Sequence, residues 1–384
     1  MRKYEFGNRP TTGEFLGKLV RVSQKVRRIE DRLDTPVCGA HSFMKAFSLV
    51  ACLSLLVSPM AYPDESEERS KINDTVSVLL KAEDFAALEK IAASYRSEEE
   101  RTSSGILKLA EFYAGMNATA VSSAEEGQAG WDRVIAIIES WIKKYPDSPT
   151  PYVAKGTALM NRGWDARGEG WASSVSRQNV ERFRQYSIEA ATFLIENAEV
   201  GSADPHWFQA LANAYMALGA GKDDFMALVD AGLERFPNYD PLYFRTAAYL
   251  SPKWHGSLAE LESFAQAAVA RTRANRGYEL YARIYWAGGL ANKQLFAFQG
   301  SEAVWEDMVR GMDDVVRKYP DQWNINHFAY FACYKGDMET TRRFLELVEE
   351  PVSAESWGGH VMNYQKCRLN AGLNPSPNIA LPER

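Results

Sequence analysis

Lys144-Tyr145-Pro146, Arg235-Phe236-Pro237 and Lys318-Tyr319-Pro320 place a cation, an aromatic residue and a proline at the ends of three apolar-periodic stretches. The cation suits the carbonyl end of a helix, where the macrodipole is negative. Proline cannot continue the helix, because it lacks the N–H group and its ring clashes with the preceding turn. Each tripeptide is therefore a helix stop signal, and its recurrence indicates a helical repeat protein.

Matching helix start signals occur at Thr150-Pro151, Asp204-Pro205 and Asp240-Pro241. Each supplies a side-chain oxygen for the cap, followed by proline at the first helical position. The last two lie 36 residues apart, close to the roughly 34-residue period of tetratricopeptide (TPR) helix pairs. The pattern predicts an all-α chain of TPR-like antiparallel helix pairs, stacked into a curved right-handed solenoid.

Helical periodicity runs from about Asp74 to Asn370, and no β pattern interrupts it. Asp84 is expected to cap one helix and Ser103-Ser104 to start another. One central pair has apolar side chains at spacings of three and four, which suits close packing between repeat helices; its members are Phe208, Leu211, Ala212 and Tyr215, then Phe225, Leu228, Val229 and Leu233. The other expected helices are 131–145, 152–163, 179–199, 257–273, 275–287, 301–318, 324–335, 338–349 and 359–370.

The charge is unevenly distributed along the 384 residues. The net charge is −6, but residues 1–61 carry ten Lys and Arg against five Asp and Glu. The remainder carries 34 against 45, a net −11. An acidic body argues against nucleic acid or anionic lipid as the main partner, and a hydrophobic content of 46% is enough to form a substantial core.

An apolar run from Ala46 to Ala61 follows Met44-Lys45 and resembles the hydrophobic region of a signal peptide, which we assign to residues 44–61. Sixteen residues interrupted by Pro59 are fewer than the roughly 20 that a spanning helix needs. Residues 1–43 are then a basic extension, either from an unused upstream start or preceding a short anchor. The export signal predicts a periplasmic or secreted protein, with the membrane involved only through that signal.

The rest of the chain divides into three expected parts. Residues 62–72 are polar and expected to be loose, residues 73–371 form the TPR-like domain, and residues 372–384 form a proline-rich disordered tail. Removal of the signal peptide leaves Cys333 and Cys367 as the cysteines of the mature chain. In an exported protein an even pair is a disulfide candidate, and two buried free thiols are the alternative.

Four motifs occur in an order that resembles a known family. They are Trp164-Asp165-Ala166-Arg167-Gly168-Glu169-Gly170, Leu250-Ser251-Pro252-Lys253-Trp254-His255-Gly256-Ser257, Tyr281-Ala282-Arg283-Ile284-Tyr285-Trp286 and Phe331-Ala332-Cys333-Tyr334-Lys335-Gly336-Asp337. Over roughly residues 75–370 the chain resembles a bacterial TPR-like family catalogued only as a domain of unknown function. The resemblance implies an α-helical repeat fold and brings no activity, substrate or catalytic residue. His255 stands where that family usually has a small residue.

The patterns that carry common chemistries are missing from the sequence. The histidines of the body are widely separated, so no metal site is expected, and no phosphate loop, dinucleotide fingerprint or serine elbow occurs. We therefore expect no catalytic residue and no cofactor.

One cluster suggests binding: Trp164, Arg167, Trp171, Trp254 and Trp286. Tryptophan and arginine anchor partners in binding grooves, but aromatic residues also fill the space between repeat layers, and an arginine in a Gly-rich turn also bonds helix carbonyls. Both interpretations remain open for this cluster. The sequence predicts an exported, non-catalytic scaffold that binds a protein or peptide in the bacterial cell envelope. The alternative is a glycan-acting envelope enzyme on a helical scaffold, and the oligomeric state is not predicted.

Overall fold

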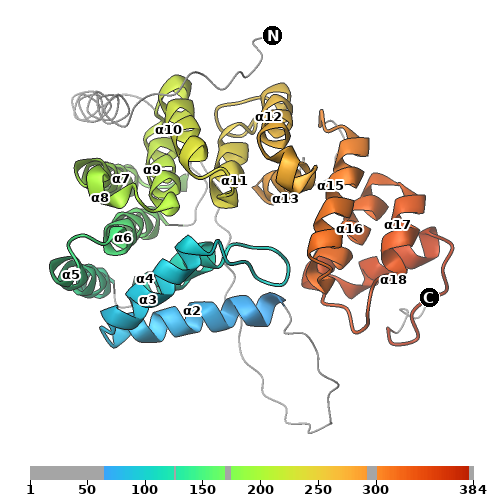
Figure 1. Ribbon diagram of the computed structural model, residues 1–384, viewed down its shortest axis with the longest axis horizontal. Helices are drawn as coiled ribbons and strands as arrows, with labels where there is room; N and C mark the ends of the chain where they lie inside the picture. The colour runs from blue at the N-terminus through green and yellow to red at the C-terminus, as the bar shows by residue number, and fades with distance from the viewer. Residues whose placement is uncertain (1–64, 125–126, 169–173, 292–300, 380–384) are drawn as a thin grey trace, which may run out of the picture. The chain divides into compact units, whose positions relative to one another are not determined.

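A computed structural model describes residues 65–124, 127–168, 174–291 and 301–379, and within these ranges all regular secondary structure is helical (Figure 1). The all-α prediction is confirmed. The expected extension 1–43, the signal peptide 44–61, Trp171 and the end of the tail lie outside the described residues. The helices are α2 Glu65–Lys81, α3 Phe85–Ser97, α4 Lys108–Ala124, α5 Gln128–Lys144, α6 Pro149–Arg167, α7 Arg177–Glu196, α8 Ala198–Gly201, α9 Pro205–Leu218, α10 Lys222–Arg235, α11 Asp240–Tyr249, α12 Leu258–Arg276, α13 Glu279–Ala291, α15 Trp305–Lys318, α16 Gln322–Lys335, α17 Met338–Leu345, the 3-10 helix η2 Glu355–Trp357, and α18 Val361–Asn370.

The three helix stop signals act as predicted. Helices α5, α10 and α15 end at Lys144, Arg235 and Lys318, the first residues of the three tripeptides. At two of these ends the aromatic residue is the cap, and the N–H groups of Tyr145 and Tyr319 donate to carbonyls in the last turn. A helix follows each stop within a few residues, so the tripeptides mark the α5–α6, α10–α11 and α15–α16 junctions.

The start signals are only partly correct. Asp204 caps α9 as predicted, because its carboxylate accepts the His206 N–H at 2.8 Å. Helix α6 is instead capped by Ser148, two residues before the predicted Thr150. Asp240 is already inside α11, and its carboxylate pairs with arginines rather than with backbone N–H groups. Buried ion pairing therefore replaces capping at this position.

Two boundaries at the start of the domain differ from expectation. Helix α2 begins at Glu65, within the stretch expected to be loose, because Ile72 is buried and Arg69 forms an ion pair with Glu111 of α4 at 3.1 Å. The acidic residues of this stretch form the first turn of α2, where negative charge is favourable. The polar run is thus an exposed helix face rather than a loose segment.

Ser103-Ser104 lies in a tight turn, and α4 begins only at Lys108. The Thr102 N–H donates to the Ile106 carbonyl at 2.8 Å, and the Thr102 hydroxyl accepts the Ile106 N–H at 3.1 Å. Hydroxyl side chains can support a turn as well as a cap. The prediction of a helix start at these serines is therefore wrong.

The beginning of the expected disordered tail is also ordered. The side chain of Gln365 in α18 donates to the carbonyls of Ser376 and Ile379 at 2.9 and 2.7 Å. It also accepts the Ser376 N–H at 2.8 Å, and the Ser376 hydroxyl donates to Glu350 at 2.6 Å. The proline-rich composition predicted disorder. The buried Gln365 instead orders the segment, because it bonds the carbonyls of Ser376 and Ile379 and the N–H group of Ser376.

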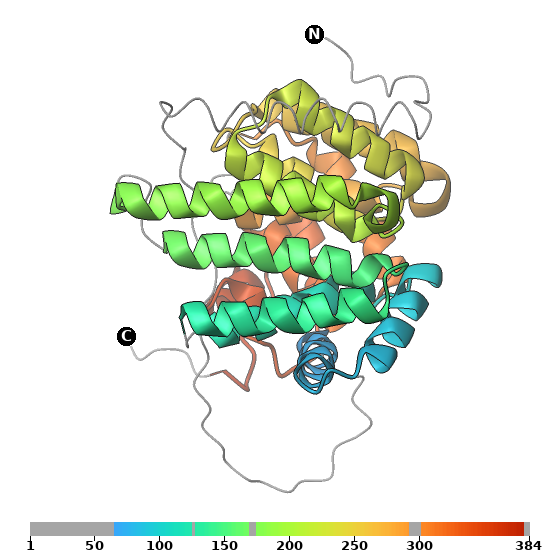
Figure 2. The ribbon, with the colours of Figure 1, turned by 90° about the vertical axis from the view of Figure 1, so that its left-hand side faces the viewer.

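The chain separates into two compact units. Within the described residues, the N-terminal unit comprises 65–100 and 108–232, and the C-terminal unit comprises 101–107 and 233–379. In the N-terminal unit the long helices α5, α6 and α7 lie side by side (Figure 2). A Cβ atom on Gly156 of α6 would lie 2.5 Å from the Leu194 side chain of α7, so this contact requires glycine.

The central helix pair of the sequence, α9 and α10, buries all eight of its predicted core side chains. In the C-terminal unit α13 packs against α11, α12 and α15, and α16 packs against α17 and α18 (Figure 1). A disulfide joins Cys333 of α16 to Cys367 of α18, with the Cα atoms 5.7 Å apart. No helix in the described ranges is long and apolar enough to cross a membrane.

Candidate functional site

The structure divides the five-residue cluster of the sequence analysis. Trp164 and Arg167 belong to α6 of the N-terminal unit, whereas Trp254 and Trp286 belong to the C-terminal unit. Helix α6 continues through Trp164 to Arg167, so the first four residues of the Gly-rich motif are helical. Its last residue is followed by Gly168, which has a φ of 78° and ends the helix.

Arg167 has the environment of a structural residue. Only 6% of it is exposed, and its guanidinium donates to the Gly168 carbonyl at 2.9 Å. The same group lies over the ring of Trp164, 5.6 Å from the centroid, and Trp164 packs on Phe183. Burial lowers the pKa of Arg167. These contacts favour the interpretation in which Arg167 bonds carbonyls at the end of α6.

Trp286 is in a different setting, because it forms one side of an aromatic cluster between α13 and α16. Its ring lies 4.6 Å from His327, 5.4 Å from Phe328 and 5.6 Å from Phe331. Trp323 lies 4.6 Å from the same imidazole. Both tryptophans are half-buried and the histidine is buried. We call Trp286 and Trp323 the tryptophan pair.

Sequence reasoning missed Trp323. The spacing of four residues between Trp323 and His327 places them on one face of a helix, and the Nδ1 atom of His327 is 2.8 Å from the Trp323 carbonyl oxygen. That spacing was visible in the sequence. What the sequence could not reveal is that Trp286, a candidate on another helix, packs against the same histidine.

Burial lowers the pKa of His327 to about 4, although the Trp323 carbonyl acts in the opposite direction. The unfolded chain binds this proton near pH 6.5, so the folded state binds fewer protons between the two values. The neutral His327 therefore makes its full contribution to the free energy of unfolding above about pH 6.5. This free energy falls by up to about 3 kcal/mol as the pH drops to 4.

Thermal unfolding of His327→Gln across this range should show a flatter pH dependence than the wild type, because the variant lacks the titrating imidazole. Parallel curves for the two proteins would contradict this assignment.

A buried charge cluster lies in the same unit, around Asp240 at the start of α11. Its carboxylate accepts Arg276 at 2.5 and 2.9 Å and Arg101 at 2.8 Å. Arg101 also donates to the carbonyls of Asn238 and Gly105. Burial alone would raise the pKa of Asp240, but Arg101 and Arg276 outweigh it and hold the pKa below its usual range. Asp240 is therefore a charged anchor and not a proton donor.

Arg101 belongs to residues 101–107, which we call the arginine loop. Arg283 of α13 and Asn324 of α16 both donate to the Ser104 carbonyl of this loop, at 2.7 and 2.9 Å. Arg283 is oriented by Glu279, which accepts its Nε–H at 3.0 Å. Arg283 precedes Trp286 by three residues and Asn324 follows Trp323 directly. The residues that hold the loop therefore neighbour the tryptophan pair on both helices.

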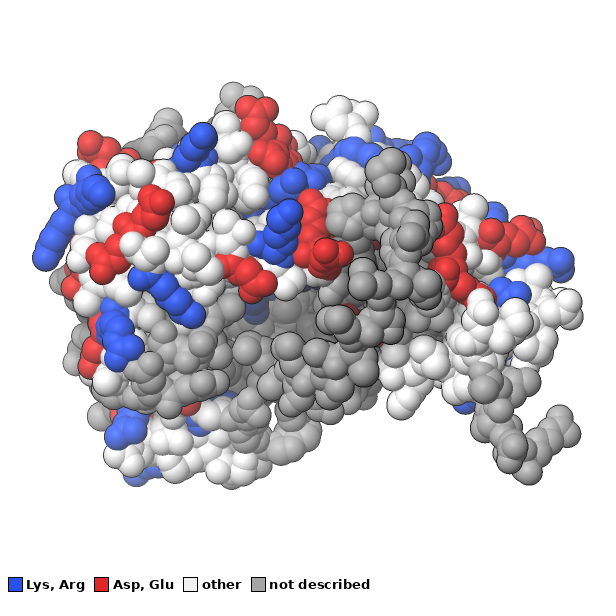
Figure 3. Space-filling model, turned by 90° about the horizontal axis from the view of Figure 1, so that it is seen from below, with Lys and Arg blue, Asp and Glu red and all other residues white. Residues whose placement is uncertain are grey.

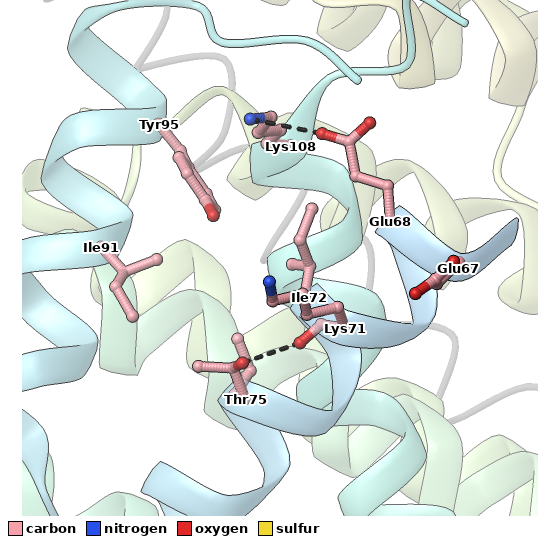
Figure 4. Close-up of a pocket in the computed structure, with 9 residues that line it drawn as sticks. Glu67, Glu68, Lys71, Ile72, Thr75, Ile91, Tyr95 and Lys108 are labelled. Carbon is pink, nitrogen blue, oxygen red and sulfur yellow. Dashed lines mark hydrogen bonds and ion pairs between the residues drawn. The ribbon is translucent and has the colours of Figure 1, made fainter. Parts of the chain in front are cut away.

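A separate cleft of about 370 Å³ lies in the N-terminal unit (Figure 4). Lys108 lies 3.4 Å from Glu68 and 3.5 Å from Glu100, so its charge is compensated within the unit. Burial raises the pKa of Tyr95 at the side of the cleft. None of the binding candidates from the sequence lies in it; the lining residues are Glu67, Glu68, Lys71, Ile72, Thr75, Val76, Ile91, Tyr95 and Lys108.

The described residues contain no group of three His, Cys, Asp or Glu that could hold a metal ion. No family model matches the chain, and no curated protein matches it. The class that the structure defines is therefore an all-helical protein of two compact units. Its C-terminal unit contains both the half-buried tryptophan pair and the buried arginine–carboxylate cluster.

Proposed function

We propose that this chain is a non-catalytic helical-repeat scaffold that binds a protein or peptide partner through the C-terminal unit. The observation that carries the proposal is the tryptophan pair, in which two half-buried tryptophans from α13 and α16 flank one buried neutral histidine. Tryptophan is enriched among the residues that dominate binding energy, because it offers a large, rigid and amphipathic contact area. The partner contact is assigned to this surface rather than to Arg167.

The proposed architecture is TPR-like, with antiparallel pairs stacked into a curved right-handed solenoid. Three helix junctions with the same cation–aromatic–proline stop support this interpretation. The resemblance to the bacterial TPR-like family supports it too. Stacked helix pairs create extended surfaces on which a partner segment can lie.

The proposed location is the periplasm or the exterior of a bacterium, after removal of residues 44–61. The Cys333–Cys367 disulfide supports this, because disulfides persist mainly in oxidising compartments. Charges of both signs are mixed on the face drawn in Figure 3, which supports a protein partner over a polyanion. Asp240 and Glu279 are engaged with arginines, so this pair does not supply the accessible carboxyl groups that the alternative, glycan hydrolysis, needs.

Affinity capture from envelope extract tests the proposal. The tagged Trp323→Ala chain should retain at most about a tenth of the wild-type partner, since truncating a tryptophan hot spot costs about 2 kcal/mol or more. Trp254→Ala is the matched control, because Trp254 is a half-buried tryptophan of the same unit whose ring lies 6.5 Å from His255. Loss of capture in the control, with capture retained by Trp323→Ala, would refute the assignment.

A further inference from the structure

The arginine loop is held in the C-terminal unit by contacts typical of a bound protein segment. The Arg101 guanidinium of this loop donates two hydrogen bonds to the Asp240 carboxylate, the shorter of which is 2.8 Å. Its main chain is held through the Ser104 carbonyl, on which Arg283 and Asn324 converge. A charged anchor combined with donors aimed at the backbone is how proteins bind turns and extended segments of other chains.

The residues that contact the arginine loop also have partners of their own within the C-terminal unit. Asp240 keeps two contacts with Arg276, and Arg276 is itself held by Glu279 at 2.6 Å. Asn324 of the same site is fully buried. Its Oδ1 atom has no hydrogen-bond partner in the part of the chain that the structure describes. Its amide nitrogen already donates to two carbonyls, so the oxygen is the free acceptor. An incoming N–H group would satisfy it.

We infer that Asp240, Arg283 and Asn324 form a receptor for an arginine-bearing turn of the partner, and that the arginine loop is the resident occupant which competes for it. This inference rests on the proposed function and names the chemistry of the ligand. The partner contributes one guanidinium to Asp240, one carbonyl to Arg283 and Asn324, and one N–H group to the Asn324 Oδ1 atom. Trp286 lies on the same helix as Arg283 and Trp323 on the same helix as Asn324, so the contact of the continuing segment is assigned to the tryptophan pair.

Two full-length variants weaken the resident loop without altering the receptor. Arg101→Gln removes the guanidinium from Asp240. Gly105→Ala acts differently, because Gly105 has a φ of 91° and an added Cβ would lie 2.5 Å from Arg283 Nη2 and 2.7 Å from the ring of Tyr319. The matched control is Arg317→Gln, which removes an arginine of the same unit whose side chain is 73% exposed.

The probe is a capped synthetic peptide with the sequence of residues 100–108, titrated into each variant by fluorescence anisotropy. Both loop variants should bind it about tenfold or more tightly than the wild type and the control. A peptide carrying Gln in place of its arginine should lose about tenfold in affinity, because hydrogen bonds between charged groups are the strong ones.

Folded loop variants that bind the peptide no better than the control would overturn the inference. It would also be overturned if neither variant folds, because the loop would then be an integral part of the unit. Capture of the natural partner separates this inference from the proposed function. If the peptide fails but Trp323→Ala still loses the partner, the binding function stands and only the arginine receptor is refuted.

Discussion

Replacing Asp240 by Asn should lower the free energy of unfolding by about 3–5 kcal/mol, the usual cost of removing one partner from a buried ion pair. The substitution leaves Arg276 and Arg101 buried beside a neutral amide, and Arg276 is only 6% exposed. Urea denaturation followed by circular dichroism measures the change. The effect arises in the fold itself, so it should appear without any partner present.

The control for Asp240 is an exposed ion pair of the same unit, Arg343 with Asp313. Asp313→Asn should cost less than about 1 kcal/mol, because exposed pairs are screened by solvent. Equal losses in the two variants would mean that the Asp240 cluster is not a buried electrostatic anchor.

The same cluster sets an acid limit on stability. The folded pKa of Asp240 lies below its unfolded value of about 3.9. A carboxylate with a depressed folded pKa stabilises the fold above the unfolded value, and this contribution is lost as the pH falls below about 4. The Asp240→Asn chain should therefore lose less stability than the wild type between pH 4 and 2.

Breaking the Cys333–Cys367 disulfide is the second large change, with an expected loss of about 3–4 kcal/mol. The bond closes a loop of 34 residues between α16 and α18, so it restricts the unfolded chain. Denaturation of the Cys333→Ser, Cys367→Ser double variant should show a lower midpoint than the oxidised wild type. The reduced wild type should have the same denaturation midpoint as the double variant. This comparison separates the effect of losing the bond from the effect of changing the side chains.

Alkylation gives the direct check on the pairing. In unfolded, unreduced protein, neither Cys333 nor Cys367 should react with a thiol reagent. Full labelling of both would refute the disulfide.

The local signals of the sequence predicted much of the helical order. A cation, an aromatic residue and a proline end a helix through forces that act within one turn, so the ends at Lys144, Arg235 and Lys318 followed directly. The core face of α9 and α10 followed from periodicity. Residues 65–72 were misassigned because polar composition does not distinguish a loose segment from the exposed face of a helix such as α2.

The candidate site was far less predictable, because its contacts join residues distant in sequence. Arg101 meets Asp240 across 139 positions, and Asn324 meets the Ser104 carbonyl across 220. No local pattern encodes such pairings. Trp286 was selected for its residue type alone, and its partner Trp323 could be recognised only once α13 and α16 were packed together.

The predicted cluster of five also shows why residue type is a weak guide to binding. Arg167 was selected as a planar donor for a ligand, but the local geometry directs its guanidinium to the Gly168 carbonyl and the Trp164 ring. An arginine at the end of a helix is attracted to the carbonyls there by the same charge that would attract a ligand.

Site-specific photocrosslinking at position 323 is the most direct test of partner binding at the tryptophan pair. A photoreactive phenylalanine derivative at this position keeps an aromatic ring there, and the same group at the exposed Arg317 serves as the control. Irradiation in living cells should produce one discrete protein adduct from position 323 and none from position 317. Equal adducts from both positions, or an adduct from position 317 alone, would contradict the account.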